Sequence, residues 1–238
     1  MSYLDYARLD ALDGEAFRNQ KPYPWVNPEG LLSDEGFDRL LHNMPDLSLF
    51  EKKFGYERIA GQKPHDRYSL EYTRETQVPI PWKEFIGELC SDRYRNILAR
   101  LFDARKINLR FHWHYTPPGC DVSPHCDARR EHGSHLFYFN SEEEWDPAWG
   151  GSTLVLDDGG RLDYNSAPDF EEFDAAYECE SIGNYSSLML RTDHAWHAVR
   201  AINCPEGRMR RIFIVVVNPV SLFWKLRDRA IGKKIQRL

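Results

Sequence analysis

Three side chains with metal-ligand chemistry are spaced so that they can bind one divalent ion. A single residue separates His125 from Asp127, and His197 follows 70 residues after Asp127. On a β-strand, side chains i and i+2 point to the same side, so His125 and Asp127 can reach one ion while Cys126 points away. Two imidazoles and one carboxylate on one face of an ion form the triad that binds non-haem Fe(II) and leaves the other positions open. The third ligand must then come from another strand.

Other histidines offer alternative ligands. His194 lies three residues before His197 and could replace it as the distal ligand. We favour His197 because it lies nearer the following strand, and otherwise expect His194 to be a loop residue with a local hydrogen bond. His112 and His114 alternate on one strand, but no carboxylate stands at ligand spacing, so we expect this pair to contribute to sheet packing.

The composition narrows the class of protein. At 238 residues, with 42% hydrophobic and 13% aromatic residues, the chain can form one domain with a packed core. The net charge of −6 does not favour binding along a nucleic-acid backbone, so we expect no nucleic-acid partner. No apolar run approaches the ~20 residues that span a bilayer, and the N-terminus lacks the form of a signal peptide. We therefore expect a cytoplasmic protein.

The cysteines support the same compartment. Their number is odd and they are scattered, which is typical of reduced thiols in the cytosol. Cys120 and Cys126 flank the proposed metal ligands, but neither has the spacing of a Cys-x-x-Cys metal site. We do not assign them as ligands.

The first part of the chain predicts supporting elements. A capping sequence at Ser33 precedes a helix that extends to about His42. Residues 67–73 alternate as a strand does. Apolar residues at helical spacing predict one long helix over 82–102.

From residue 106 onward, short strand-like runs alternate with turns rich in glycine, proline, asparagine and aspartate, which favours a double-sheet jelly roll. The predicted fold is therefore mainly β with flanking helices, and its core is a double-stranded β-helix of the jelly-roll or cupin-like kind. N-terminal helices should pack on the major sheet. Within a single domain, 1–238, we expect helical and strand support at 1–105, the core at 106–219 and a basic helix at 220–238. Packing of that last helix on the domain is favoured over contact with a membrane surface.

Several motifs surround the ligands in a fixed order. A tyrosine-containing turn begins ten residues before His125, and further motifs end one strand, precede the next, follow the distal histidine and open the last strand. They are Tyr115-Thr-Pro-Pro-Gly119, Tyr138-Phe139-Asn140, Trp145-Asp146, Gly150-Gly151-Ser-Thr-Leu154, His197-Ala-Val199 and the basic residues within 208–211. Over roughly residues 107–219 the chain resembles the Fe(II)- and 2-oxoglutarate-dependent dioxygenases, in their prolyl-hydroxylase-like branch.

The resemblance implies an activity and its site. It implies a dioxygenase that uses Fe(II), 2-oxoglutarate as cosubstrate and O2, with ascorbate as a possible support, and that hydroxylates an unactivated C–H bond with release of succinate and CO2. The catalytic and metal-binding residues would be His125, Asp127 and His197. A carboxylate at Asp127 argues against the related halogenases, which have a small residue there. Tyr115 and Tyr138 match positions whose hydroxyl groups assist cosubstrate binding.

A dicarboxylate cosubstrate also needs a cation for its far carboxylate. The guanidinium of arginine suits this role because it pairs with a carboxylate through two hydrogen bonds. Arg208, Arg210 and Arg211 are the candidates. Counting back from Asn218 as in the resembled family favours Arg210, and the other two remain open.

The substrate is less well defined by the sequence. Residues 159–182 contain seven acidic residues and one arginine. They predict either a solvated excursion or a mobile lid that selects the substrate, and their charge weakly suggests a cationic or amine-bearing substrate. Arg129, Arg130 and Trp145 are candidates for the substrate entrance. A small molecule or a peptide remains possible as the substrate. The alternative functions are a non-catalytic, cupin-like protein that binds a metal and a small ligand, and a scaffold that binds a partner.

Overall fold

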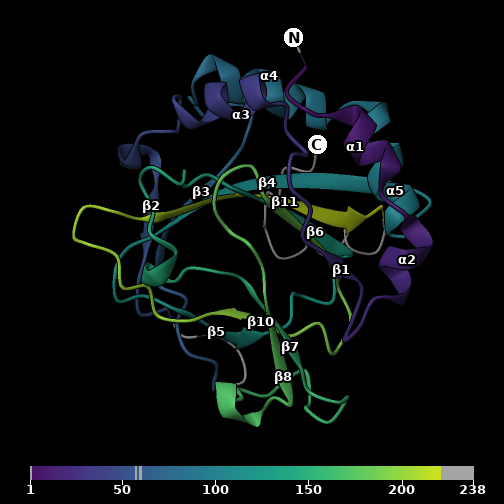
Figure 1. Ribbon diagram of the computed structural model, residues 1–238, viewed down its shortest axis with the longest axis vertical. Helices are drawn as coiled ribbons and strands as arrows, with labels where there is room; N and C mark the ends of the chain where they lie inside the picture. The colour runs from purple at the N-terminus through teal and green to yellow at the C-terminus, as the bar shows by residue number, and fades with distance from the viewer. Residues whose placement is uncertain (1, 57, 59–60, 221–238) are drawn as a thin grey trace.

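The computed structural model describes residues 2–56, 58 and 61–220, and its strands form two antiparallel sheets that face each other (Figure 1). The large sheet has the order β1-β9-β6-β11-β4-β3-β2, and the small sheet has the order β5-β10-β7-β8. The strands are β1 (Trp25–Val26), β2 (Glu51–Lys53), β3 (Arg67–Glu71), β4 (Ile107–Thr116), β5 (Val122–His125), β6 (Gly133–Tyr138), β7 (Leu154–Asp157), β8 (Ala175–Glu178), β9 (Ser186–Leu190), β10 (His197–Val199) and β11 (Arg210–Pro219). This arrangement confirms the predicted jelly-roll core.

Helices cover the outer face of the large sheet, on the side away from the small sheet (Figure 1). They are α1 (Tyr6–Ala11), α2 (Gly14–Asn19), α3 (Asp34–Leu41), α4 (Ile80–Leu89) and α5 (Asp92–Leu101). Short 3-10 turns, η1 (Leu47–Leu49), η3 (Pro147–Trp149) and η4 (Phe170–Glu172), lie in the connections. No helix in the described part of the chain is long and apolar enough to cross a membrane.

The main core lies between the helices and the large sheet. Alternate residues of β4, such as Phe111 and Trp113, point toward the helices and are buried. Trp82 of α4 is fully buried against them, with ring centroids 5.2 Å from Trp113 and 5.0 Å from Phe213 of β11. Because strand side chains alternate, the intervening residues of β4 and β11 point toward the small sheet. The space between the two sheets is where the candidate site lies.

The helices show where local sequence signals were sufficient. The helix after Ser33 is present as α3, and the Ser33 hydroxyl accepts a hydrogen bond from Gly36 N at 3.1 Å. The prediction of one helix over 82–102 is wrong, because two helices occupy this stretch. Ser91 begins the second one, since its hydroxyl accepts a hydrogen bond from Tyr94 N at 3.3 Å. The apolar spacing continues through the break, which is why periodicity alone did not reveal it.

The acidic segment 159–182 is more structured than a lid would be. Its strand β8 pairs with β7 at the edge of the small sheet. Four of its aromatic and aliphatic side chains pack on the cluster around the fully buried Trp196. They are Leu162, Tyr164, Phe170 and Phe173. The predicted basic helix at 220–238 lies, apart from Val220, outside the described residues.

Candidate metal centre and its cavity

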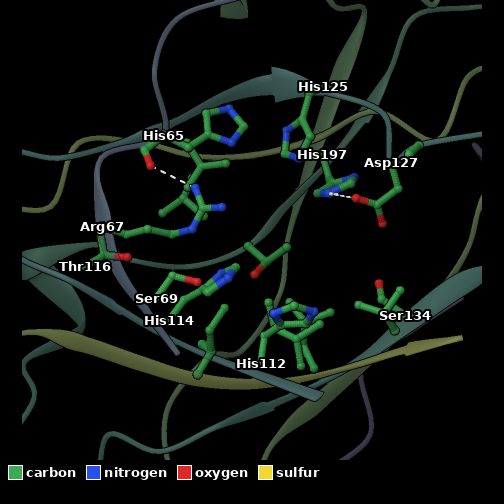
Figure 2. Close-up of a pocket in the computed structure, with 18 of the residues that line it drawn as sticks. His65, Arg67, Ser69, His112, His114, Thr116, His125, Asp127, Ser134 and His197 are labelled. Atoms are coloured by element: carbon green, nitrogen blue, oxygen red, sulfur yellow. Dashed lines mark hydrogen bonds and ion pairs between the residues drawn. The ribbon is translucent and has the colours of Figure 1, made fainter. Parts of the chain in front are cut away.

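The small sheet brings the three predicted ligands together. His125 is the last residue of β5 and His197 the first of β10, and the antiparallel register pairs them directly. Their ring centroids are 4.3 Å apart. Asp127 follows β5, and its Oδ1 lies 3.7 Å from Nε2 of His197. One ligand atom from each of the three residues lies within 4.8 Å of the others, a separation that suits a single ion (Figure 2).

Both imidazoles are held in the tautomer that a metal requires. Nδ1 of His125 donates a hydrogen bond to Ser123 O at 2.9 Å, and Nδ1 of His197 donates one to Ala195 O at 3.1 Å. Because a carbonyl can only accept, Nδ1 carries a proton in each ring, and in the neutral form of the ring Nε2 is the nitrogen that keeps its lone pair. Burial holds the pKa of His125 well below its usual value, so this ring is neutral at neutral pH. Neutral imidazoles and a carboxylate are the protonation states that bind a transition metal.

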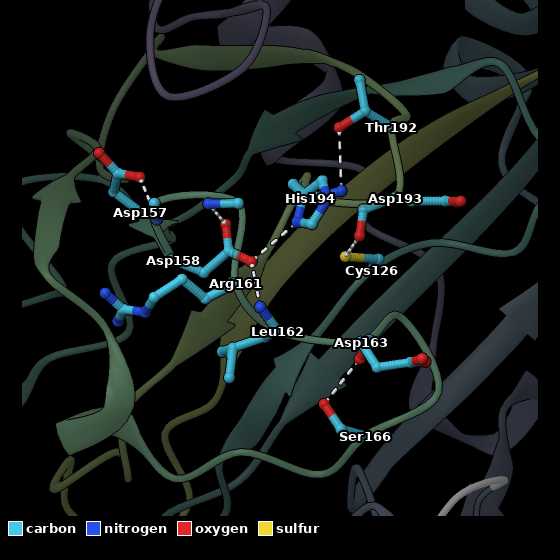
Figure 3. A network of polar contacts seen from close by, with 12 residues as sticks. Cys126, Asp157, Asp158, Arg161, Leu162, Asp163, Ser166, Thr192, Asp193 and His194 are labelled. Atoms are coloured by element: carbon cyan, nitrogen blue, oxygen red, sulfur yellow. Dashed lines mark hydrogen bonds and ion pairs between the residues drawn. The ribbon is translucent and has the colours of Figure 1, made fainter.

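The rejected ligand candidates point elsewhere. Nδ1 of His194 lies 2.8 Å from Oδ2 of the buried Asp158, at the start of the acidic segment (Figure 3). Asp158 also accepts hydrogen bonds from Gly160 N and Leu162 N. His194 therefore stabilises the loop at residues 158–162 and does not point to the candidate metal site. Cys126 packs in the cluster around Trp196, and its Sγ lies 3.6 Å from Asp193 O.

Arg210 opens β11 on the face that lines the cavity. It is 4% exposed, its Nε donates to Gly151 O, and its Nη2 donates to Thr153 Oγ1 at 3.0 Å. Gly151 has φ of 94°, and a Cβ there would lie 3.2 Å from Cδ of Arg210, so the double-glycine motif gives the guanidinium its place. Among the described residues no carboxylate lies within ion-pair distance of Arg210. Burying an unpaired cation is costly, so an anion bound at Arg210 would offset that cost.

The other two arginine candidates are already paired. Arg211 alternates to the outer face of the large sheet, where its Nη2 contacts Glu144. Nη1 of Arg208 lies 3.6 Å from Oε2 of the same Glu144, and half of the Arg208 side chain is exposed. The geometry therefore leaves Arg210 as the candidate for the carboxylate of a cosubstrate.

The two predicted tyrosines have different positions. The hydroxyl of Tyr138 lies 2.9 Å from Thr153 Oγ1 and 2.8 Å from Ser187 Oγ, and its ring centroid is 5.7 Å from Cζ of Arg210. It therefore supports the group that holds Arg210. Tyr115 points to the outer face of the sheet, where its hydroxyl donates to Pro45 O at 3.0 Å. The structure does not bring Tyr115 into the cavity, because its register on β4 places it opposite to the metal ligands.

The proposed entrance residues are also divided. Arg130 lines the cavity. Arg129 is an exposed residue that forms an ion pair with Asp193 at 3.1 Å. Trp145 is buried beside Trp149, and its Nε1 donates to Gly150 O at 3.0 Å, so it supports the double-glycine turn.

A cavity of about 650 Å³ extends from the three ligands between the sheets. One wall, from β6, β9 and β11, is largely apolar and includes Leu136, Met189 and Ile212. The adjoining half of the same large sheet, from β3 and β4, forms a polar wall whose side chains the sequence did not reveal (Figure 2). They include Arg67, Ser69, His112, His114 and Thr116, with His65 from the preceding loop.

His112 and His114 therefore line the cavity, whereas we expected them to contribute to sheet packing. Burial, and next the charge of Arg110, lowers the pKa of His112 to about 3, and burial lowers that of His114 well below its usual value. The signal in the sequence was the alternation of polar and apolar residues along 107–116. It identifies two faces, but it does not say which of them meets a cavity.

Comparisons with known proteins agree on the fold. No protein-family model matches the sequence, and none of the curated proteins matches it. Among solved structures, a prolyl-4-hydroxylase from Pseudomonas putida is similar with a TM-score of 0.60 and 14% identity, over 87% of this chain and 98% of that one. A prolyl hydroxylase from Trichoplax adhaerens, in complex with a peptide fragment of hypoxia-inducible factor, has a TM-score of 0.60 and 11% identity, over 96% and 94%.

A third similar structure has a different reaction. The non-haem α-ketoglutarate-dependent carbocyclase SnoK from nogalamycin biosynthesis has a TM-score of 0.61 and 12% identity, over 89% of this chain and 85% of that one. At these identities the likeness shows the fold, which is that of the 2-oxoglutarate- and Fe(II)-dependent oxygenases, prolyl hydroxylases among them.

Proposed function

We propose that this protein is an Fe(II)- and 2-oxoglutarate-dependent dioxygenase that hydroxylates an unactivated C–H bond and releases succinate and CO2. One observation carries the proposal. Two imidazoles with free Nε2 atoms and one carboxylate converge at a cavity that also contains a buried arginine without an acidic partner among the described residues. This fold in solved oxygenases supports the same reading.

The donor set fits the implied metal. His125, Asp127 and His197 would hold Fe(II) on one face and leave its remaining positions for the cosubstrate and O2. When bound, Fe(II) and 2-oxoglutarate together supply the oxidising chemistry that breaks a C–H bond. The backbone carbonyls of Ser123 and Ala195 keep the two rings oriented with Nε2 toward the ion.

The cosubstrate site fits a dicarboxylate. Arg210 would pair with the far carboxylate through N–H groups that Gly151 and Thr153 do not use. Thr153 also accepts a hydrogen bond from the Tyr138 hydroxyl, which helps to fix the orientation of the guanidinium group. The apolar side chains of β6, β9 and β11 would cover the carbon chain and exclude water, which strengthens the ion pair.

The experiment measures cosubstrate use directly. With Fe(II), ascorbate, 2-oxoglutarate and a panel of small-molecule and peptide substrates, we expect succinate and O2 consumption to require both Fe(II) and 2-oxoglutarate. Asp127→Ala should abolish both signals. Asp174→Ala, which removes an exposed carboxylate paired with Arg161, is the matched control and should leave them intact. A wild-type protein that binds both Fe(II) and 2-oxoglutarate but forms no succinate with any substrate would refute the dioxygenase and favour a metal-binding protein without turnover.

A further inference from the structure

The polar wall of the cavity is built by strand alternation. Along β3 the residues that face the small sheet are Arg67, Ser69 and Glu71, while Tyr68 and Leu70 face the helices. Polar side chains on the inner face of a jelly roll replace the apolar contacts that would otherwise stabilise it. Such a departure from ordinary core composition is typical of a functional surface.

The charges on this wall do not balance internally. Glu51 pairs with Lys53 at 3.3 Å, and Glu71 pairs with Arg110 at 3.3 Å. Glu131 lies 3.7 Å from Nη1 of Arg110 and 3.8 Å from Nε of Arg130. Each acidic group at the cavity, apart from the candidate metal ligand Asp127, therefore already forms an ion pair with a lysine or an arginine.

Two further cavity arginines remain without a carboxylate. Among the described residues, neither Arg58 nor Arg67 has an acidic group within ion-pair distance. Nη1 of Arg67 donates to His65 O at 2.8 Å, and its buried Nε has no hydrogen-bond partner among the described residues (Figure 2). Nη1 of Arg58 contacts the ring of His65.

These two guanidinium groups also repel each other. Burial, and after it the charge of Arg67, lowers the pKa of Arg58 to about 10, so Arg58 remains charged at neutral pH. Burial likewise lowers the pKa of Arg67. Like charges held together in a partly buried site are stabilised by an anion that binds between them.

The pair lies next to the metal ligands. His65 joins them to the centre, because its ring centroid is 4.4 Å from that of His125 and its Nε2 lies 3.0 Å from Ser123 Oγ. The ring of His114 lies below Arg67 in Figure 2 and also lines the cavity. Arg67 on β3 and Arg210 on β11 line the cavity from the two sides of β4, so a molecule held by Arg67 would lie beside the Arg210 site and next to the candidate metal ligands.

We propose that the substrate of this site carries a carboxylate or phosphate group, which Arg67 binds together with Arg58. The inference rests on the proposed dioxygenase function and names the substrate class for it. The cavity volume of about 650 Å³ lies within the range of roughly 300–1,000 Å³ typical of small-molecule sites.

This assignment replaces the cationic substrate suggested by the acidic segment 159–182. None of the residues of that segment lines the cavity. Two of its acids have partners outside the cavity: Asp169 pairs with Lys63, and Asp174 pairs with Arg161. The positive charge of the cavity arginines, and not the negative charge of segment 159–182, would therefore contact the substrate.

The first test compares probes that share one alkyl chain. Hexanoate, hexyl phosphate, hexanamide and hexylamine are titrated by calorimetry, under argon, into the protein with Fe(II) and saturating 2-oxoglutarate. We expect the two anions to bind and the amide and amine to bind at least tenfold more weakly. The tighter of the two anions distinguishes a carboxylate substrate from a phosphate substrate. Equal affinity for the amide or the amine would overturn the proposal.

The second test uses variants. Arg67→Gln should weaken anion binding by about 10- to 100-fold, because it removes charge-assisted hydrogen bonds, and Arg67→Lys should restore part of it. The affinity for 2-oxoglutarate should stay within about twofold. Arg93→Gln, which removes an exposed ion pair with Asp10, is the matched control and should change neither affinity. If Arg67→Gln weakens 2-oxoglutarate as much as Arg210→Gln does, Arg67 serves the cosubstrate and the proposal fails.

Two provisions keep the result decisive. If Arg67→Gln does not fold, Arg58→Gln, which lies outside the strands, is measured in the same way, and unchanged anion binding in that variant would refute the proposal. The calorimetric signal does not depend on turnover. A wild-type protein that binds the anions but releases no succinate would therefore count against the proposed function and leave the anion site supported.

Discussion

Removing the charge of Arg210 tests the cosubstrate site most directly. Nε and Nη2 of this buried arginine already donate to Gly151 and Thr153, which leaves Nη1 and the second N–H of Nη2 for a carboxylate. Arg210→Gln removes those donors and the charge. The candidate metal ligands lie on or next to the small sheet, so we expect metal binding to be little affected.

The magnitude follows from the energy of such contacts. Hydrogen bonds between charged groups contribute about 1.5–3 kcal/mol, so the Kd for 2-oxoglutarate should rise by about 10- to 100-fold. At a cosubstrate concentration of ~100 times the wild-type Kd, binding stabilises the folded protein by ~2.7 kcal/mol. In the variant the same concentration contributes only ~0.4–1.4 kcal/mol. At about 3 °C per kcal/mol, the ligand-induced rise in Tm should fall from ~8 °C to ~1–4 °C.

The assay is thermal unfolding under argon, with Fe(II), with and without 2-oxoglutarate. Arg211→Gln is the matched control, because Arg211 is on the same strand but pairs with Glu144 on the outer face. We expect its ligand-induced shift to equal that of the wild type. The assignment would be refuted by an Arg210→Gln protein that keeps the full shift, and an Arg211→Gln protein that loses it would transfer the role.

Four further outcomes are expected. In anaerobic Fe(II) titrations His197→Ala should lose metal binding and His194→Ala should keep it; the reverse would overturn the distal ligand. Thr153→Val should raise the Kd for 2-oxoglutarate several-fold through loss of a hydrogen bond to Arg210, and an unchanged Kd would show that Gly151 alone positions that arginine. The pKa of His112 is lowered to about 3 in the folded protein, so as the pH falls this histidine takes up a proton in the unfolded chain before it does so in the folded one. The free energy of unfolding should therefore not depend on His112 above about pH 6.5, and should fall by up to ~1.4 kcal/mol per pH unit between pH 6.5 and 3. Urea unfolding of His112→Asn should show a shallower loss, and an equally steep one would contradict this cause. Shortening 163–169, which leaves β8 in place, should spare Fe(II) and 2-oxoglutarate binding, and loss of either would make the segment part of the site.

The cluster of His125, Asp127 and His197 and the inward position of Arg210 were predictable from the sequence because these positions depend on local spacing. Two residues on a strand share a face whatever the rest of the fold does, so His125 and Asp127 could be paired before any topology was known. The order of the glycine, histidine and arginine motifs then placed the remaining groups.

The polar wall was not accessible in the same way. Whether His114 or Tyr115 faces the cavity depends on which side of β4 meets the small sheet, and both are aromatic residues that could serve a site. Strand alternation fixes that adjacent residues point apart, but only the packing of helices on one face decides the direction. The break at Ser91 was missed for a related reason, since a cap is a local feature that apolar periodicity does not record.

The way His125 and His197 are held, as candidate ligands, has a consequence for how this protein can vary. Each ring is oriented by the backbone carbonyl of the residue two positions earlier in the sequence. The orienting group is thus encoded in the path of the backbone, and side chains such as that of Ala195 do not supply it. Substitutions at these positions can accumulate while the ligand geometry persists, whereas an inserted residue would displace a ring at once. A centre built in this way tolerates amino-acid substitutions far better than insertions or deletions beside the two histidines.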